Sequence, residues 1–200
     1  MPIVLVVVAI AVSVLAAFIY GKGILKEKSH PSWITWLLLA LIAILNATSY
    51  QVLSDGGIVA LLPKVNSTNT VLTFLFIMYG YRRLRKTLEF PDRIDIVILV
   101  AVILVILIVA VWKDFEIAAG ANVTIQICAV VAFVPTLRKL HNENPLPWFL
   151  WSIGFFLNSI IFLLDWQGTI FALVYPVGGI ISNFVIGVLA MRKCKARGIK

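Results

Sequence analysis

Long apolar runs separated by short polar segments divide the whole chain. Each run is close to the ~20 residues that a helix needs to cross the hydrocarbon core of a bilayer. Six of these runs are residues 3–20, 33–53, 94–112, 117–137, 147–164 and 169–191. A seventh, roughly 65–81, is more polar where it begins. Because a segment in lipid must satisfy its own backbone hydrogen bonds, we predict an all-α membrane protein with seven transmembrane helices.

Part of this pattern occurs twice, 115 residues apart. Trp33 and Trp36 open the second run, and Trp148 and Trp151 open the sixth run with the same spacing. Four further identities at this offset are Ile10 and Ile125, Ala17 and Ala132, Phe18 and Phe133, and Leu25 and Leu140. A repeat of this size in a membrane chain is typical of two bundles that enclose a site between them.

The repeat divides the chain into three parts in a 3+1+3 arrangement. We predict a first three-helix repeat over residues 1–90, a linker helix over 91–114 and a second three-helix repeat over 115–200 with a basic tail. Beyond Asp95 at its start, the linker run is almost pure Ile, Val, Leu and Ala up to Trp112, so its interior offers no polar group to a solute. A single helix between two three-helix units gives both units the same orientation, so the repeats are parallel.

Composition and charge support a multi-pass topology. The chain is 62% hydrophobic and 13% charged, with a mean hydropathy of +1.04, which exceeds what a soluble core absorbs. Of the 17 lysines and arginines, only Lys64 and Lys113 fall outside four alternate segments. Those segments are 21–32, 82–93, 138–146 and 192–200. The positive-inside rule then predicts an integral protein of the cell membrane, plasma or inner, with the N-terminus outside and the C-terminus cytoplasmic.

Several functional classes find no support in the sequence. The net charge of +8 is spread over four short loops, which argues against nucleic-acid binding. Cys128 and Cys194 lie in different parts of the predicted topology, and no cluster of metal ligands is visible, so we expect neither metal nor cofactor. No paired carboxylates or Ser–His set lies within the runs, so we do not expect an enzyme. The expected partners are a small-molecule solute and membrane lipid; a functional monomer suffices, and a homo-oligomer is compatible with the sequence.

Local motifs in the second repeat are the most specific. The fifth run ends in Phe133-Val134-Pro135-Thr136, and the sixth begins with Leu146-Pro147-Trp148-Phe149. Phe156-Leu157-Asn158 is followed by Phe162, and Asn183 lies four residues before Gly187. In the first repeat Asn46 and Tyr50 follow Trp36, Asn69 lies near the start of the third run, and Tyr20 stands at the position matching Pro135.

These motifs, with the 3+1+3 pattern, resemble the SWEET sugar transporters and the wider PQ-loop family. The resemblance implies that Pro135 belongs to the family's proline–glutamine turn, with Thr136 in place of glutamine. It implies solute contacts by Asn183, Asn158 and Phe162. Asn46, Tyr50 and Asn69 are the nearest counterparts in the first repeat, which departs more from the family pattern. Bacterial nicotinamide-riboside-type transporters share the architecture and remain an alternative.

The polar residues inside the runs are neutral amides and hydroxyls, which can bond to a neutral polyol. Asn158 and Phe162 are four residues apart and share a helix face, and Asn46 and Tyr50 repeat that spacing. We therefore predict a substrate pocket with pseudo-twofold character. The alternative interpretation is that these amides only join helices to one another.

Four residues are candidates for a gate or hinge. Pro135 removes a helical hydrogen bond and so favours a hinge. Trp36 and Trp151 favour either an aromatic belt or a seam near an inner gate. Asp165 is the only carboxylate near a run's interior, and it is a proton-coupling site, an outer gate residue or a helix-end charge.

The expected function is facilitated diffusion of a small neutral, sugar-like solute by alternating access between the two repeats. Two alternatives remain open. One is a PQ-loop or vitamin-type transporter of nucleosides or amino acids with proton coupling. The other is a non-transporting receptor or scaffold on the same fold, in which the basic tail 192–197 binds anionic lipid or a partner.

Overall fold

The computed structural model contains six helices and no strand among the residues it describes. The described residues are 2–29, 31–53, 58–84, 91, 93–111, 120, 123, 124, 126, 127, 129, 130, 133, 143–164 and 171–196. The helices are α1 (Pro2–Leu25), α2 (Trp33–Leu53), α3 (Ile58–Arg83), α4 (Arg93–Val111), α7 (Pro145–Leu164) and α8 (Phe171–Ala196).

Six of the seven predicted runs therefore form helices close to their expected bounds. The third helix begins at Ile58 instead of near residue 65, and it continues through Pro63 and the polar stretch that follows. The predicted fifth run lies mostly outside the described residues, although those described between 120 and 130 are helical. The seven-helix 3+1+3 arrangement thus stays a prediction.

Four of the described helices are long and apolar enough to cross a membrane. The qualifying stretches are Ile3–Leu25, Trp33–Tyr50, Pro145–Leu164 and Leu173–Arg192. Large apolar side chains such as Val4, Phe18 and Val97 are 62–68% exposed on the outside of the bundle. A soluble domain rarely exposes so much contiguous apolar surface. The chain is therefore an all-helical membrane protein.

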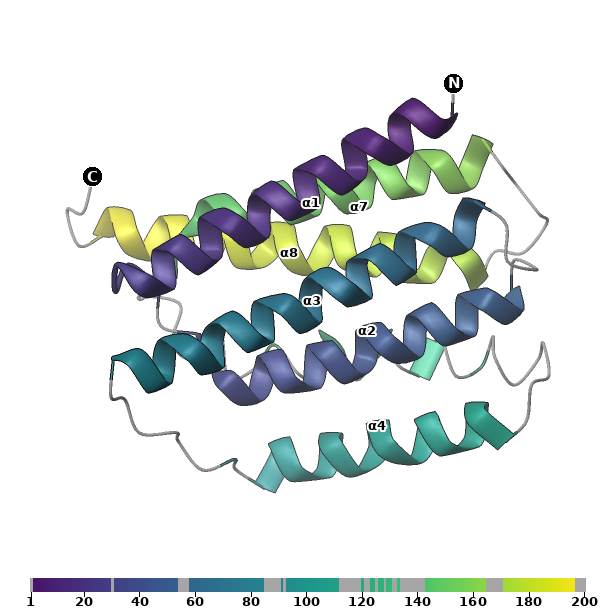
Figure 1. Ribbon diagram of the computed structural model, residues 1–200, viewed down its shortest axis with the longest axis horizontal. Helices are drawn as coiled ribbons and strands as arrows, with labels where there is room; N and C mark the ends of the chain where they lie inside the picture. Colours follow the sequence, from purple (N-terminus) through teal and green to yellow (C-terminus); the bar gives the residue numbers. More distant parts are fainter. Residues whose placement is uncertain are drawn as a thin grey trace.

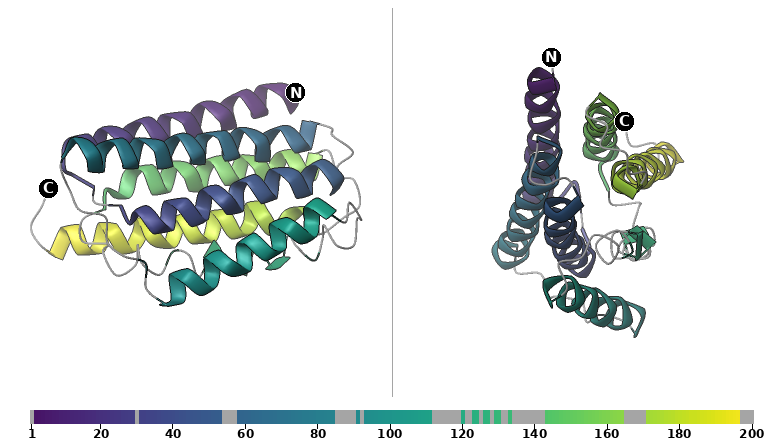
Figure 2. Two further views of the ribbon diagram at one scale, coloured as in Figure 1. Left: turned by 60° about the horizontal axis from the view of Figure 1, so that its bottom comes forward. Right: turned by 90° about the vertical axis from the view of Figure 1, so that its right-hand side faces the viewer.

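The helices lie roughly side by side in an elongated bundle (Figures 1 and 2). In the first half of the chain α3 packs against both α1 and α2, and α4 packs on the outside of α2. In the second half α7 packs against α8. Among the described residues, the two halves meet mainly where α1 contacts α7. The α4 contact rests on Ile98 and Val102, while most other described side chains of α4 face outward.

Small side chains allow α1 and α7 to approach closely. Ala9 and Ala16 of α1 are buried, and Gly154 of α7 faces Ser13. A Cβ added at Gly154 would come within 2.7 Å of the Ser13 hydroxyl oxygen. Close backbone approach through small residues is the usual way in which membrane helices pack. The α1–α7 contact is therefore a fixed junction between the two halves.

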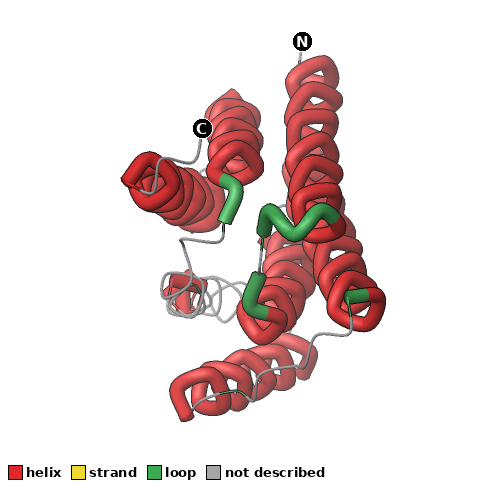
Figure 3. The backbone as a smooth tube through the Cα atoms, turned by 90° about the vertical axis from the view of Figure 1, so that its left-hand side faces the viewer, coloured by secondary structure: helices red, strands yellow, loops and turns green. Residues whose placement is uncertain are grey.

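The basic residues gather at one end of the bundle, which we call the basic end. Figure 1 shows that α1, α3 and α8 end there and that α2, α4 and α7 begin there. Exposed basic side chains at this end include Lys26, Lys28, Arg82, Arg83 and Arg192. Figure 3 looks onto this end, where the loop before α2 meets the segment before α7. The Asn144 backbone N–H donates to the Ser29 hydroxyl oxygen at 3.3 Å across that meeting point.

Candidate functional site

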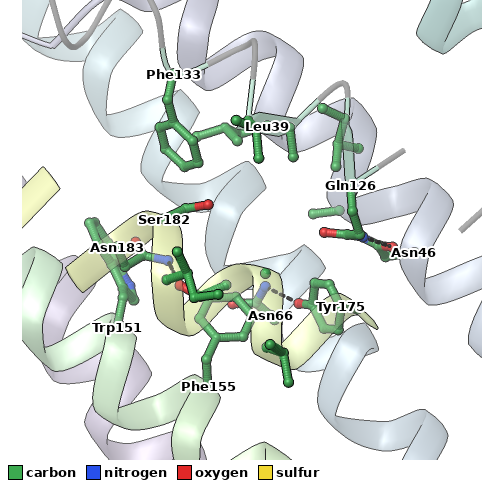
Figure 4. A pocket seen from close by; sticks show the side chains of 18 of the residues that line it. Leu39, Asn46, Asn66, Gln126, Phe133, Trp151, Phe155, Tyr175, Ser182 and Asn183 are labelled. Atoms are coloured by element: carbon green, nitrogen blue, oxygen red, sulfur yellow. Dashed lines mark hydrogen bonds between the residues drawn. The ribbon is translucent and has the colours of Figure 1, made fainter. Parts of the chain in front are cut away.

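A pocket of about 460 Å³ lies among α2, α3, α7 and α8 (Figure 4). Its volume falls within the ~300–1,000 Å³ range of small-molecule sites. The walls are mostly aliphatic and aromatic, and six described residues of the predicted fifth run contribute to them. No charged side chain lines the pocket among the residues that the structure describes. Such a pocket suits a small neutral solute.

Two hydrogen bonds between helices cross the pocket wall. Gln126 Nε2 donates to Asn46 Oδ1 at 2.9 Å and so joins the predicted fifth run to α2. Asn66 Nδ2 donates to the Tyr175 hydroxyl oxygen and so joins α3 to α8. These two bonds satisfy part of the hydrogen-bonding capacity of the three amides, which lowers the free-energy cost of placing them among apolar groups. Each amide also keeps hydrogen-bonding capacity that a solute can use.

Asn183 and Ser182 supply the polar atoms on the α8 side of the pocket. Asn183 Nδ2 donates to the Gly179 carbonyl, one helical turn earlier, at 2.7 Å. That bond orients the carboxamide and leaves its oxygen without a protein donor among the described residues. The Ser182 hydroxyl faces the same space in Figure 4. Asn183 is therefore a preoriented acceptor.

Four aromatic rings close the pocket toward the basic end; we call Tyr20, Trp36, Trp148 and Trp151 the basic-end cluster. All six pairs of these rings have centroids between 5.2 and 6.0 Å apart. Tilted and edge-on ring pairs at such distances stabilise packing beyond the area they bury. Two of the rings belong to α1 and α2 and two belong to α7, so the cluster also joins the two halves of the chain.

A buried carboxyl group completes the basic-end cluster. Glu143, just before α7, is 2% exposed. Tyr20 Oη donates to its Oε1 at 3.2 Å, and Trp148 Nε1 donates to its Oε2 at 3.4 Å. Trp36 Nε1 in turn donates to Tyr20 Oη at 3.2 Å. Burial raises the pKa of Glu143 to about 8, although the two hydrogen bonds act in the opposite direction.

A second group of rings closes the pocket at the other end; we call Tyr50, Phe155, Phe162 and Tyr175 the opposite-end cluster. Tyr50 lies 5.3 Å from Phe162 and 5.6 Å from Tyr175 between ring centroids, and Phe155 lies 5.2 Å from Tyr175. Tyr50, Phe162 and Tyr175 are each less than 5% exposed. This cluster too draws on both halves of the chain, through α2, α7 and α8.

Positions that the sequence repeat relates to one another meet directly in the structure. Three such contacts are seen. Two of them join residues 115 positions apart in the sequence. The third joins residues 112 positions apart, and this same offset separates Asn46 from Asn158. The pairs are Ser29 with Asn144, Trp36 with Trp151, and Tyr50 with Phe162. A residue can touch its own counterpart only near a twofold axis. These contacts are those expected of a pseudo-twofold axis that passes through both aromatic clusters and the pocket.

The predicted site residues fall into four groups. Asn46, Asn183, Trp36 and Trp151 line the pocket, while Tyr50 and Phe162 belong to the opposite-end cluster. Asn69 and Asn158 are buried but are not among the lining residues. Asn69 Nδ2 donates to the Ser13 carbonyl at 3.0 Å, which ties α3 to α1. Pro135 and Asp165 lie outside the described residues.

Three features of the site were not predicted from the sequence. Glu143 precedes the apolar run and was grouped with a loop. Asn66 stands in the polar start of the third run, which was expected to lie near a span end. Tyr20 was noted only as a departure from the family pattern. Its bond to Glu143 joins residues that are 123 positions apart, and no local spacing in the chain signals such a pair.

Comparison with protein-family models, with curated proteins and with solved structures gives no match for this chain. The site must therefore be interpreted from its own geometry. Within the described part of the chain, no three His, Cys, Asp or Glu side chains gather as metal ligands.

Proposed function

We propose that this chain is a membrane transporter that carries a small neutral solute by facilitated diffusion. The observation that supports this most is a central pocket with an aromatic cluster at each end, each cluster drawing residues from both halves of the chain. Relative rocking of the halves would separate one cluster while the other stays closed. That is the geometry which alternating access requires.

In this mechanism the fulcrum is the middle of the α1–α7 junction, where Gly154 meets Ser13. It is packed through small side chains and therefore tolerates little sliding. Asn46 and Asn183, on opposite walls of the pocket, bind the solute, while Trp36 and Trp151 form the gate at the basic end. A sugar-like solute is the expectation that follows from the resemblance to SWEET transporters.

The test is counterflow in liposomes that contain the purified full chain, over a panel of sugars, amino acids and nucleosides. We expect at least one class to exchange, and we expect Asn183→Leu to slow that exchange at least tenfold. Thr68→Val serves as the matched control, because Thr68 is exposed on α3 and is not among the pocket-lining residues. Absence of exchange for every class, with folded protein in the liposomes, would contradict transport and favour the receptor or scaffold alternative.

We also propose that the basic end faces the cytoplasm of the cell membrane and that the N-terminus lies outside. The support is the gathering of exposed lysines and arginines at one end of the bundle. Single cysteines placed at Lys28 and near the N-terminus, in a background without Cys128 and Cys194, would report the orientation through a membrane-impermeant thiol reagent. Labelling of the cysteine introduced at Lys28 from outside intact cells would show that the orientation is the opposite of the one proposed.

A second candidate function is proton-linked transport, which the buried Glu143 favours. In the closed arrangement the pKa of Glu143 is raised to about 8, and hydration on opening would return it toward its ordinary value of 4.5. Closing would then take up a proton between these pH values, and opening would release it. Opening at the basic end thus becomes easier as pH rises from about 4.5 to about 8.

Solute flux under an imposed pH gradient separates the two candidates. Proton-linked transport predicts that a gradient drives accumulation in the wild type and that Glu143→Gln retains exchange but loses accumulation. Uncoupled diffusion predicts exchange without accumulation in both proteins. Accumulation that survives Glu143→Gln would place the coupling group elsewhere.

A further inference from the structure

We infer that the pocket selects a neutral solute with an apolar ring body and a hydrogen-bonding group at each of two opposite sides, in preference to a sugar. This inference deepens the proposed solute pocket and rests on it. It departs from the sugar-like expectation because it follows from the distribution of polar atoms in the pocket.

The first observation is the scarcity of polar groups in the pocket wall. The lining contains Trp36, Phe133, Trp148, Trp151 and Phe155, together with aliphatic side chains of α2, α8 and the predicted fifth run. Flat aromatic and aliphatic walls favour a ring that can stack on them. They offer no replacement for the water that a hydroxyl loses on entry.

The second observation is the placement of the polar groups that do exist. Figure 4 shows the Asn46–Gln126 pair on one side of the pocket and Ser182 with Asn183 on the other. The Asn46–Gln126 pair retains both donor and acceptor capacity after its internal bond at 2.9 Å. It can therefore receive a carboxamide, which also donates and accepts.

The α8 side has a different character. The Asn183 oxygen is an acceptor held in place by the bond from its own amide nitrogen to the Gly179 carbonyl. The Ser182 hydroxyl lies beside it. Together they suit a hydroxyl group on the solute, which donates to one and accepts from the other. The other polar groups of the lining already have partners. Asn66 donates to the Tyr175 hydroxyl, and the Thr70 hydroxyl donates to the Asn66 backbone carbonyl at 2.8 Å.

A sugar is a poor fit to this arrangement. Its hydroxyls surround the ring, so those that face Phe133, Leu39 or Phe155 would lose water without gaining a partner. Each hydroxyl left unpaired weakens binding by roughly tenfold. A charged solute fits less well still, because no described lining side chain carries a charge that could offset its desolvation.

The experiment compares matched ligands on the purified full chain in lipid nanodiscs. The probe is 4-hydroxybenzamide, which carries a carboxamide and a hydroxyl at opposite sides of a flat ring. Its controls are benzamide, which lacks the hydroxyl, 4-hydroxybenzoate, which replaces the amide by a carboxylate, and glucose. Calorimetry gives the affinities, and quenching of the fluorescence of Trp36, Trp148 and Trp151 reports occupancy of the pocket.

We expect 4-hydroxybenzamide to bind at least tenfold more tightly than each of the three controls. Asn46→Leu and Asn183→Leu should each weaken it about tenfold, whereas Thr68→Val should leave the affinity unchanged. Because helix content by circular dichroism reports folding independently, a loss of binding in a folded variant supports the assignment of that side chain.

The inference is overturned if glucose or 4-hydroxybenzoate binds as tightly as 4-hydroxybenzamide, or if the folded wild type binds no 4-hydroxybenzamide. The counterflow experiment separates this outcome from a failure of transport. Selective binding of 4-hydroxybenzamide without counterflow of 4-hydroxybenzamide itself would leave the inference standing and reject the transporter. Glucose counterflow without binding of the ring compounds would keep the transporter and reject the inference.

Discussion

The two ends of the pocket are closed by the same kind of residue but not in the same way. At the basic end every ring of the cluster touches every other, and indole and phenol groups direct hydrogen bonds into Glu143 or the Tyr20 hydroxyl. At the opposite end the rings form a chain of contacts, and the Tyr175 hydroxyl accepts a bond from the neutral Asn66.

This difference indicates that the two ends of the pocket are not held with equal strength. Three side-chain hydrogen bonds converge on Glu143 and the Tyr20 hydroxyl at the basic end, and each contributes about 1 kcal/mol. The basic end also joins α1, α2 and α7 through one compact cluster. We therefore expect the opposite end to open more readily and the basic end to contribute more to stability. The following predictions test this asymmetry, beginning with the largest effect.

Removing one large ring from each cluster should show the asymmetry most clearly. Trp148 is fully buried and contacts Tyr20, Trp36 and Trp151, so Trp148→Ala should lower the free energy of unfolding by about 3–5 kcal/mol. Phe162→Ala should cost less than Trp148→Ala, because fewer rings surround it and no hydrogen bond is lost. Thermal unfolding in detergent measures both effects.

The exposed Phe156 supplies the control, since it is 54% exposed on the same helix. Phe156→Ala should shift the unfolding temperature little. Equal losses for Trp148→Ala and Phe162→Ala would show that the two ends contribute equally.

Neighbouring glycines on α8 test how tightly the opposite-end cluster is packed. A Cβ at Gly179 would lie 2.5 Å from the ring of Phe155, whereas a Cβ at Gly178 would meet only Gln126 Oε1 at 3.6 Å. Gly179→Ala should therefore destabilise by about 1–3 kcal/mol through overpacking. Gly178→Ala should be neutral or slightly stabilising, because alanine favours the helix. Similar unfolding temperatures for the two variants would mean that Phe155 moves aside freely.

Deleting a single hydroxyl at each end compares their hydrogen bonds. Tyr20→Phe removes the donor to Glu143 and the acceptor for Trp36, and we expect a loss of about 1.5–3 kcal/mol. Tyr175→Phe removes only the neutral acceptor for Asn66, so about 0.5–1.5 kcal/mol is expected. Chemical unfolding of the two variants in parallel gives the difference, and a larger loss for Tyr175→Phe would reverse the proposed ranking.

The smallest effect at neutral pH is expected for Glu143→Gln. The pKa of Glu143 is raised from 4.5 to about 8, so the protonated carboxyl contributes its stability fully below pH 4.5 and loses it as pH rises through about 8. The wild type should therefore lose stability steadily between about pH 4.5 and about pH 8 and change little above that, while Glu143→Gln should show no such loss. Parallel pH profiles of unfolding for both proteins would show that Glu143 does not titrate in this range.

Much of the fold was predictable because apolar run length is a strong signal in a membrane chain. The runs predicted α1, α2, α4, α7 and α8 to within a few residues. The start of α3 was placed too late, because Pro63 and Lys64 stand between the apolar residues 58–62 and the polar stretch that follows. In the fold, Asn66 and Asn69 of that stretch bond to Tyr175 and to α1, which makes a polar helix acceptable there.

The candidate site was less predictable than the helices. A spacing of four residues within one helix suggested that Asn158 acts together with Phe162 and that Asn46 acts together with Tyr50. Asn46 lines the pocket and Asn158 does not. Two residues that share one face of a helix do not reveal which other helix packs against that face. Asn158 is only 6% exposed and is not among the pocket-lining residues.

The sequence by itself determined that the chain is helical and membrane-embedded, that it contains a repeat, and that its basic residues alternate along the chain. These properties depend on local composition and on spacing, which any reader of the chain can follow. Only the tertiary structure decided that Tyr20, Trp36, Trp148 and Glu143 form one cluster and that Asn46 faces Gln126. The Tyr20–Glu143 and Asn46–Gln126 bonds join residues 123 and 80 positions apart. Packing between helices selects such contacts through shape and hydrogen bonding that no single segment encodes.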